Sequence, residues 1–216
     1  SGLKFDDNMQ IIGLVSPEGE PIPSTIIVDP ARANGNVEVW LVELEKNMLA
    51  SIRELIFKSQ ESYQGLSFCD WLQIWPGQVV IAIMGLYWTS EVMEAMDTKG
   101  NAGMHEYAQS MRDLMVDIVA LVRSDIPKLV RKTLEALIVL YVHNRDTVTE
   151  LAEQGCAQTD DFDWLKQLRY FVEENPDVPG QKDMFVRLTN SFLGYAYEYL
   201  GNSSRLVVTP LTDRGY

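Results

Sequence analysis

The chain has 216 residues, of which 31 are acidic and 18 are Lys or Arg, so its formal net charge is −13. Hydrophobic residues make up 46% of the sequence, which is more apolar surface than a disordered chain carries. The negative charge repels nucleic-acid phosphates and anionic lipids, and no basic cluster compensates for it, so we expect no nucleic-acid and no membrane binding. The two Cys are too few for a disulfide framework and favour a reducing, intracellular compartment.

The first part of the chain has the pattern of strands around a turn. Residues 9–15 and 25–28 are rich in β-branched side chains, and residues 16–21 between them have the Pro and Gly content of a turn. Pro21, Pro23 and Pro30 lack the N–H that an inner strand donates. Residues 1–35 are therefore predicted to form a β-hairpin and loop that lies at an edge or projects from the body.

Apolar residues then recur at three- and four-residue spacing, which is typical of amphipathic helices. The spacing predicts a helix of about twenty residues after an N-cap at Asn36, a short helix over 70–75, and long helices over 76–93, 105–123 and 127–153. The first long helix has an apolar stripe that we expect to be buried, consisting of Val37, Trp40, Leu41, Leu44, Met48, Ile52 and Leu55. Residues 97–103 have a loop composition, and Gly155 is expected to end the last long helix.

Long helices joined by short loops bury their apolar stripes only against one another. The predicted fold class is therefore mainly α, an elongated antiparallel helical bundle with two small β-hairpins. Residues 36–200 are expected to form the bundle, with the second hairpin near 168–190, and residues 201–216 to form a connecting segment. We expect Leu137 to face the core. A stiff body of this kind suits the transmission of force.

The sequence offers little for catalysis. Nucleophilic catalysis needs a base beside the nucleophile, and the only imidazoles are His105 and His143. We expect His143 to be a hydrogen-bonded structural residue at a helix seam, with a Ser-His-Asp site as the less favoured alternative, and His105 to be exposed. Cys69, Cys156 and the two His lack the short paired spacing of a zinc site, and no G-x-x-x-x-G-K-[ST] phosphate loop occurs. The prediction is no catalytic residue, no metal site and no enzyme activity in this chain alone.

The C-terminal stretch carries a resemblance to a known family. Residues 197–214, Tyr-Glu-Tyr-Leu-Gly-Asn-Ser-Ser-Arg-Leu-Val-Val-Thr-Pro-Leu-Thr-Asp-Arg, resemble the segment of dynein heavy chains that joins the linker to the first AAA+ module. Further stretches support the resemblance in the same order, namely 36–41, 76–80, 142–146 and 162–170. The residues Gly-Asn-Ser-Ser-Arg at 201–205 are more similar to axonemal than to cytoplasmic heavy chains. Gly215 departs from the pattern, in which Cys is expected.

The resemblance implies a mechanical part. In dynein heavy chains the linker is a mostly helical rod that arches over a ring of AAA+ modules and bends with the nucleotide state of the first. This chain would be the C-terminal part of that linker, coupling ATP-driven changes in the ring to force on microtubules. The implied partners are the AAA+ ring modules of the same heavy chain, dynein intermediate and light chains, and microtubules. The implied location is the cytoplasm and cytoskeleton, in the cilium axoneme.

The resemblance also implies a nucleotide contact in the full-length protein only. The family segment that enters the first module helps to form the adenine pocket, and the residues that match it here are Leu206, Val207, Val208, Thr209, Pro210 and Leu211. No cofactor is expected in this chain by itself, and ATP or ADP is expected in the full-length motor. The competing hypothesis is a helical scaffold or adaptor that docks an acidic face onto basic protein partners. A G-x-x-x-x-G-K-[ST] loop downstream of Tyr216 would favour the motor.

Overall fold

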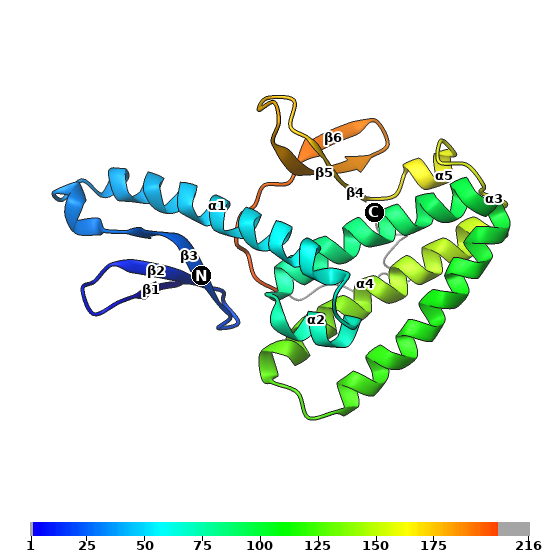
Figure 1. Ribbon diagram of the computed structural model, residues 1–216, viewed down its shortest axis with the longest axis horizontal. Helices are drawn as coiled ribbons and strands as arrows, with labels where there is room; N and C mark the ends of the chain where they lie inside the picture. The colour runs from blue at the N-terminus through cyan, green and yellow to red at the C-terminus, as the bar shows by residue number, and fades with distance from the viewer. Residues whose placement is uncertain (1, 203–216) are drawn as a thin grey trace, which may run out of the picture. The chain divides into compact units, whose positions relative to one another are not determined.

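The computed structural model describes residues 2–202 (Figure 1). The described residues divide into two compact units, the first formed by residues 2–83, 127–133 and 196–202 and the second by residues 84–126 and 134–195. The fold is mainly α with small antiparallel sheets, which confirms the predicted fold class. The boundaries predicted at residues 35 and 200 stay a prediction.

The elements follow one another in chain order. The helices are α1 (Val37–Tyr63), α2 (Phe68–Ile74), α3 (Gly77–Arg123), α4 (Lys128–Glu153) and α5 (Phe162–Leu165), and a 3₁₀ turn, η1 (Pro30–Ala33), precedes α1. The first sheet has the order β1 (Gly2–Phe5), β2 (Ile11–Val15) and β3 (Pro21–Val28). The second sheet has the order β4 (Arg169–Glu174), β5 (Lys182–Leu188) and β6 (Ser191–Gly194). Each predicted hairpin is thus present and is extended by a third strand.

The outer edge of β3 is covered by polar side chains of α1. The amide of Asn47 accepts a hydrogen bond from the Ile26 N–H at 3.0 Å and donates one to the Ile26 carbonyl at 2.6 Å. The Ser51 hydroxyl accepts a hydrogen bond from the Thr25 N–H at 2.9 Å. Both side chains are buried, and they satisfy backbone groups that a neighbouring strand would otherwise have to pair. The predicted edge position of the strand is therefore confirmed, and α1 covers the edge.

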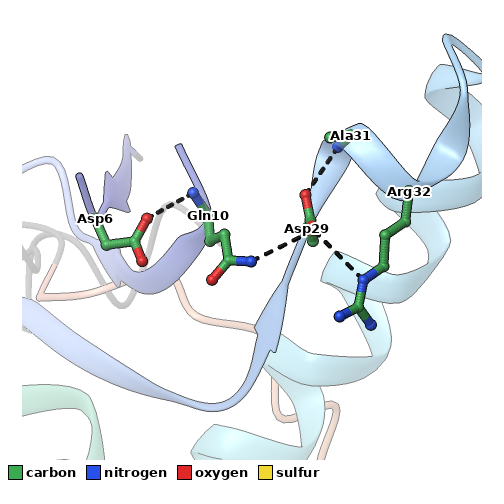
Figure 2. Close-up of polar contacts among 5 residues, drawn as sticks. All are labelled: Asp6, Gln10, Asp29, Ala31 and Arg32. Atoms are coloured by element: carbon green, nitrogen blue, oxygen red, sulfur yellow. Dashed lines mark hydrogen bonds and ion pairs between the residues drawn. The ribbon is translucent and has the colours of Figure 1, made fainter. Parts of the chain in front are cut away.

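A polar network joins the turn after β1 to the start of η1 (Figure 2). The Asp6 carboxylate accepts a hydrogen bond from the Gln10 N–H at 2.8 Å, and the Gln10 side chain donates to Asp29 at 3.4 Å. Asp29 caps η1 by accepting from the Ala31 N–H at 3.0 Å, and it pairs with Arg32 at 3.4 Å. Asp29 thus holds the end of β3, the turn after β1 and the approach to α1 together.

The apolar stripe predicted for α1 is only partly buried. Asn36 is the N-cap, as predicted, although its side chain makes no capping hydrogen bond. Val37 and Leu41 are 53% and 45% exposed, whereas Ile52 is fully buried. The expectation of a buried stripe was therefore wrong for the first turns. Periodicity identifies the apolar face of a helix, but it does not say along which turns another element covers that face.

Helix α3 has a sharp break at Gly100, where φ is 57° and ψ is −137°. This conformation is accessible essentially only to glycine. The loop predicted over 97–103 was therefore wrong, because helical structure continues on both sides and the break is confined to one residue. Figure 1 shows that α3 folds back on itself, and its later part is the helix that was predicted over 105–123.

Helix α4 begins after Pro127 and ends before Gly155, as predicted. Its apolar stripe is buried in the second unit, and Leu137 is 1% exposed. The second sheet is held against α3 by a hydrogen bond from the Tyr170 N–H to the Thr89 hydroxyl, at 2.9 Å. This bond fastens the start of β4 to α3.

Among the described residues, one helix is long and apolar enough to cross a membrane by length and composition, and it is α3. In its most apolar stretch, 56% of the residues are buried inside the protein. A helix in the core of a folded protein passes the same test.

Candidate functional site

The residues predicted to contact adenine, Leu206, Val207, Val208, Thr209, Pro210 and Leu211, lie outside the described residues. Their role therefore stays a prediction. The structure does describe the segment that precedes them, up to Asn202.

Both imidazoles lie on the surface of the protein. His105 is exposed, as predicted, and His143 is also exposed, so its predicted place at a helix seam was wrong. The apolar stripe of α4 turns Tyr141 and Val148 inward, and this leaves His143 on the solvent side. Within residues 2–202, no group of three or more His, Cys, Asp or Glu side chains has an arrangement that could hold a metal ion.

The two thiols lie in different surroundings. Cys69 is half-buried, whereas Cys156 is buried and only 6% exposed. Burial raises the pKa of the Cys156 thiol to about 12, and the neighbouring Asp161 carboxylate contributes further to the rise. The same carboxylate accepts hydrogen bonds from the N–H groups of Ala157 at 2.9 Å and Gln158 at 3.0 Å. We therefore assign Cys156 a structural role in the loop after α4.

This difference predicts unequal alkylation. Raising the pKa of Cys156 from 9.0 to about 12 lowers its thiolate fraction near neutral pH about a thousandfold. Iodoacetamide at pH 8 should therefore modify Cys69 well before Cys156 in the native protein, as followed by mass spectrometry of the peptides. In denaturant both thiols should react at similar rates, which is the control. Equal rates in the native protein would contradict the burial of Cys156.

The best-defined polar site of the first unit holds the segment 198–202. Gln78, in the first turn of α3, uses its whole side-chain amide for this purpose. It donates to the carbonyl of Glu198 at 2.6 Å and accepts from the N–H groups of Leu200 at 2.8 Å and Gly201 at 3.0 Å. One side chain thereby satisfies three backbone groups of a segment that lies outside any sheet.

Glu20 joins this segment to the start of α3. The hydroxyl of Tyr199 lies 2.9 Å from the Glu20 carbonyl oxygen and 3.1 Å from its carboxylate, where it acts as the donor. The other carboxylate oxygen accepts from the Gly77 N–H at 2.9 Å. Tyr199 is 3% exposed, and burial, assisted by Glu20, raises the pKa of its hydroxyl. The tyrosine therefore stays neutral and remains a donor to Glu20.

Asn202 completes the site. Its side chain donates to the Thr133 hydroxyl of α4 at 3.0 Å. The contact depends on Gly77, since a Cβ there would lie 1.8 Å from Nδ2 of Asn202 and 2.6 Å from the Thr133 hydroxyl oxygen. We call residues 198–202, together with Glu20, Gln78 and Thr133, the tail anchor.

In the tail anchor, the Gln78 amide and the Glu20 carboxylate bind backbone groups, whereas the hydrogen bond between Asn202 and Thr133 joins two side chains. Sequence reasoning singled out residues 76–80 and the stretch from 197 only as parts of a resemblance, and it placed Glu20 in a turn. The pattern gave no signal that these three stretches meet, because they are separated by more than fifty residues.

The fold and the tail anchor describe a mainly helical protein in which the segment 198–202 is bound to the first turn of the long helix α3. Residues 1–59 match the family described as dynein heavy chain, N-terminal region 2. The chain is 41% identical over 214 residues to dynein axonemal heavy chain 12 of Rattus norvegicus, a match that covers 99% of this chain and 7% of the relative. It is 41% identical to dynein axonemal heavy chain 3 of Homo sapiens and 39% identical to dynein axonemal heavy chain 1 of Mus musculus, each over 99% of this chain and 5% of the relative.

The chain belongs to the dynein heavy chain family, and its similarity to axonemal members extends along nearly its whole length. The resemblance inferred from the C-terminal stretch is thereby confirmed. The chain spans 5–7% of the length of these relatives.

Proposed function

We propose that this chain is a mechanical element of a dynein heavy chain, the C-terminal part of the linker that leads into the first AAA+ module. In this role it couples ATP-driven changes in the ring to force on microtubules. The observation that carries the proposal is the tail anchor. A segment that continues toward a nucleotide-binding module transmits displacement only if it is fastened to the body that moves, and Gln78, Glu20 and Thr133 fasten it.

The nucleotide role that we propose belongs to the full-length protein. Leu206, Val207, Val208, Thr209, Pro210 and Leu211 follow the tail anchor within a few residues, and we propose that they contribute to the adenine pocket of the first module. Apolar side chains suit the flat face of adenine, and its polar edge can form hydrogen bonds with a backbone. ATP or ADP would then bind in the full-length motor, while this chain alone carries no cofactor.

The proposed partners follow from the family. They are the AAA+ ring modules of the same heavy chain, dynein intermediate and light chains, and microtubules, with no nucleic acid and no membrane lipid among them. The relatives are axonemal heavy chains, which corresponds to a cytoskeletal location in the cilium axoneme. Family membership favours this motor role over the scaffold that docks onto basic proteins.

The test separates ATP turnover from movement in the full-length heavy chain. Gln78→Ala removes all three amide contacts of the tail anchor, each worth about 0.5–1.5 kcal/mol. We expect microtubule gliding to slow markedly while ATP turnover stays close to wild type. The variant leaves the ATP-hydrolysing ring unchanged and weakens the attachment of the segment 198–202 to the linker.

Gln109→Ala is the matched control, since Gln109 lies on the same helix, is exposed, and forms its side-chain hydrogen bonds with Asp113 and Arg112 of α3. It should change neither quantity. Unchanged gliding in Gln78→Ala, or an equal fall in gliding and ATP turnover, would contradict the proposed coupling. A separate assay addresses catalysis: the isolated chain with ATP should release phosphate only at the background rate.

A further inference from the structure

The apolar stripe of α1 is uncovered over the first turns of the helix, residues 37–48. Val37 and Leu41 are exposed, and Leu44 and Met48 are only half-buried. The same stripe is closed further along the helix, where Ile52 is fully buried. An apolar surface that continues out of a core along one face of a helix is typical of an interface.

The described neighbours of α1 cover other parts of its surface. Helix α2 packs on the later turns, where the Trp71 indole donates to the Ser59 carbonyl at 2.9 Å. Strand β3 runs along an adjoining side of α1, and there it is bound by Asn47 and Ser51 (Figure 1). The stripe over residues 37–48 is thus left open between a sheet on one side and solvent on the other.

The spacing of the uncovered residues is that of a coiled-coil seam. Val37, Leu41, Leu44 and Met48 are separated by four, three and four residues, which are the d, a, d and a positions of a heptad. Side chains at these positions insert between those of a second helix. We call these four residues the α1 seam. Its geometry favours a helix over an extended strand as the partner.

The charges beside the α1 seam define the chemistry of that helix. In the same register Glu38 and Glu45 occupy e positions, which flank the seam. Both carboxylates are exposed, and no ion pair within residues 2–202 involves either of them. Acidic residues at e positions select Lys or Arg on the facing helix, and they repel anionic lipid.

The size of the α1 seam indicates where the partner comes from. A stable complex of separate proteins buries about 800 Å² on each side, which four partly exposed side chains do not supply. A helix in the same polypeptide is held at a high effective concentration, so a short seam is enough to bind it. The relatives are far longer than this chain, which spans 5–7% of their length.

We propose that the α1 seam packs against a basic amphipathic helix of the same dynein heavy chain, outside these 216 residues. The apolar stripe of that helix fills the seam, and its Lys or Arg side chains pair with Glu38 and Glu45. The inference depends on family membership and not on the transmission of force, so either proposal can fail without the other.

The test uses the purified full-length heavy chain. Leu41 is replaced with the photo-crosslinker p-benzoylphenylalanine, and cross-linked peptides are identified by mass spectrometry after irradiation. We expect a link to one segment of the same heavy chain whose apolar residues recur at three- and four-residue spacing and are flanked by Lys or Arg. The photo-crosslinker at Val42 is the matched control, because Val42 is 48% exposed but lies off the seam, and it should not give this link.

Charge reversal tests the recognition by the two carboxylates. With the photo-crosslinker at position 41, Glu38→Lys combined with Glu45→Lys should lower the yield of the link about threefold, because attractive contacts become repulsive. Glu43→Lys is the control, since Glu43 is exposed and lies at a c position away from the seam, and it should leave the yield unchanged.

Three results would overturn the proposal. The first is the absence of any link that forms from position 41 and not from position 42. The second is a link to a different polypeptide or to an acidic segment, which would refute the assigned partner. The third is an unchanged yield after reversal of Glu38 and Glu45, which would refute the basic flank. All replaced residues are exposed, so the variants are expected to keep the fold of α1.

Discussion

Replacing Trp71 with Ala is expected to lower the free energy of unfolding by about 3–5 kcal/mol. Trp71 of α2 is fully buried, and its indole N–H donates to the carbonyl of Ser59 in α1 at 2.9 Å. Its ring meets that of Tyr63 edge-on, with centroids 5.1 Å apart. The side chain therefore fastens a seven-residue helix onto α1, and truncating it leaves a cavity as well as a lost hydrogen bond.

Urea denaturation followed by circular dichroism measures this effect. Ile74→Ala on the same helix is the control, because Ile74 is 61% exposed and should change the stability by less than about 0.5 kcal/mol. Trp71→Phe keeps most of the ring and should fall between the two. If Trp71→Ala costs no more than Ile74→Ala, α2 does not pack through this residue.

Replacing Leu137 with Ala should destabilise the second unit by about 2–5 kcal/mol. The side chain is 1% exposed in the middle of α4, and the buried Leu134 and Tyr141 lie on the same face of the helix. The expected loss of stability has two parts: the burial free energy of the methyl groups that are removed, and the cost of the cavity that remains.

The same denaturation experiment applies, with Val116→Ala as the control. Val116 belongs to the same unit and is 68% exposed, so its truncation should have little effect. A change below about 0.5 kcal/mol for Leu137→Ala would contradict its place in the core.

The local sequence pattern predicted the limits of a helix correctly where a residue that starts or ends helices marks them. The start of α1 at Asn36 and the limits of α4 at Pro127 and Gly155 were correct. The second hairpin was also correct, but β6 was missed because Ser191–Gly194 has four exposed residues and no alternation of buried and exposed positions. The break at Gly100 was predicted as a loop, since composition alone does not distinguish a long loop from a single glycine with positive φ.

The tail anchor was harder to predict from the sequence than the helices and strands. Gln78 and Glu20 are ordinary polar residues of a first helical turn and of a strand connection, and nothing around them indicates a distant partner. Asn47 and Ser51 interrupt the apolar stripe of α1 at a spacing of four, which is a signal that polar side chains face the interior. That signal could have been found, but the strand edge that they cover could not.

The amino-acid sequence alone determined the mainly helical class, most of the helix limits and, through its C-terminal stretch, the family, because these depend on residues that are close together along the chain. Only the tertiary structure decided which turns of α1 are covered, how Glu20, Gln78 and Thr133 come to hold the segment 198–202, and that Arg169 is buried. These features depend on contacts between residues far apart in the chain, which form only when the helices and sheets pack together and exclude water from the groups between them.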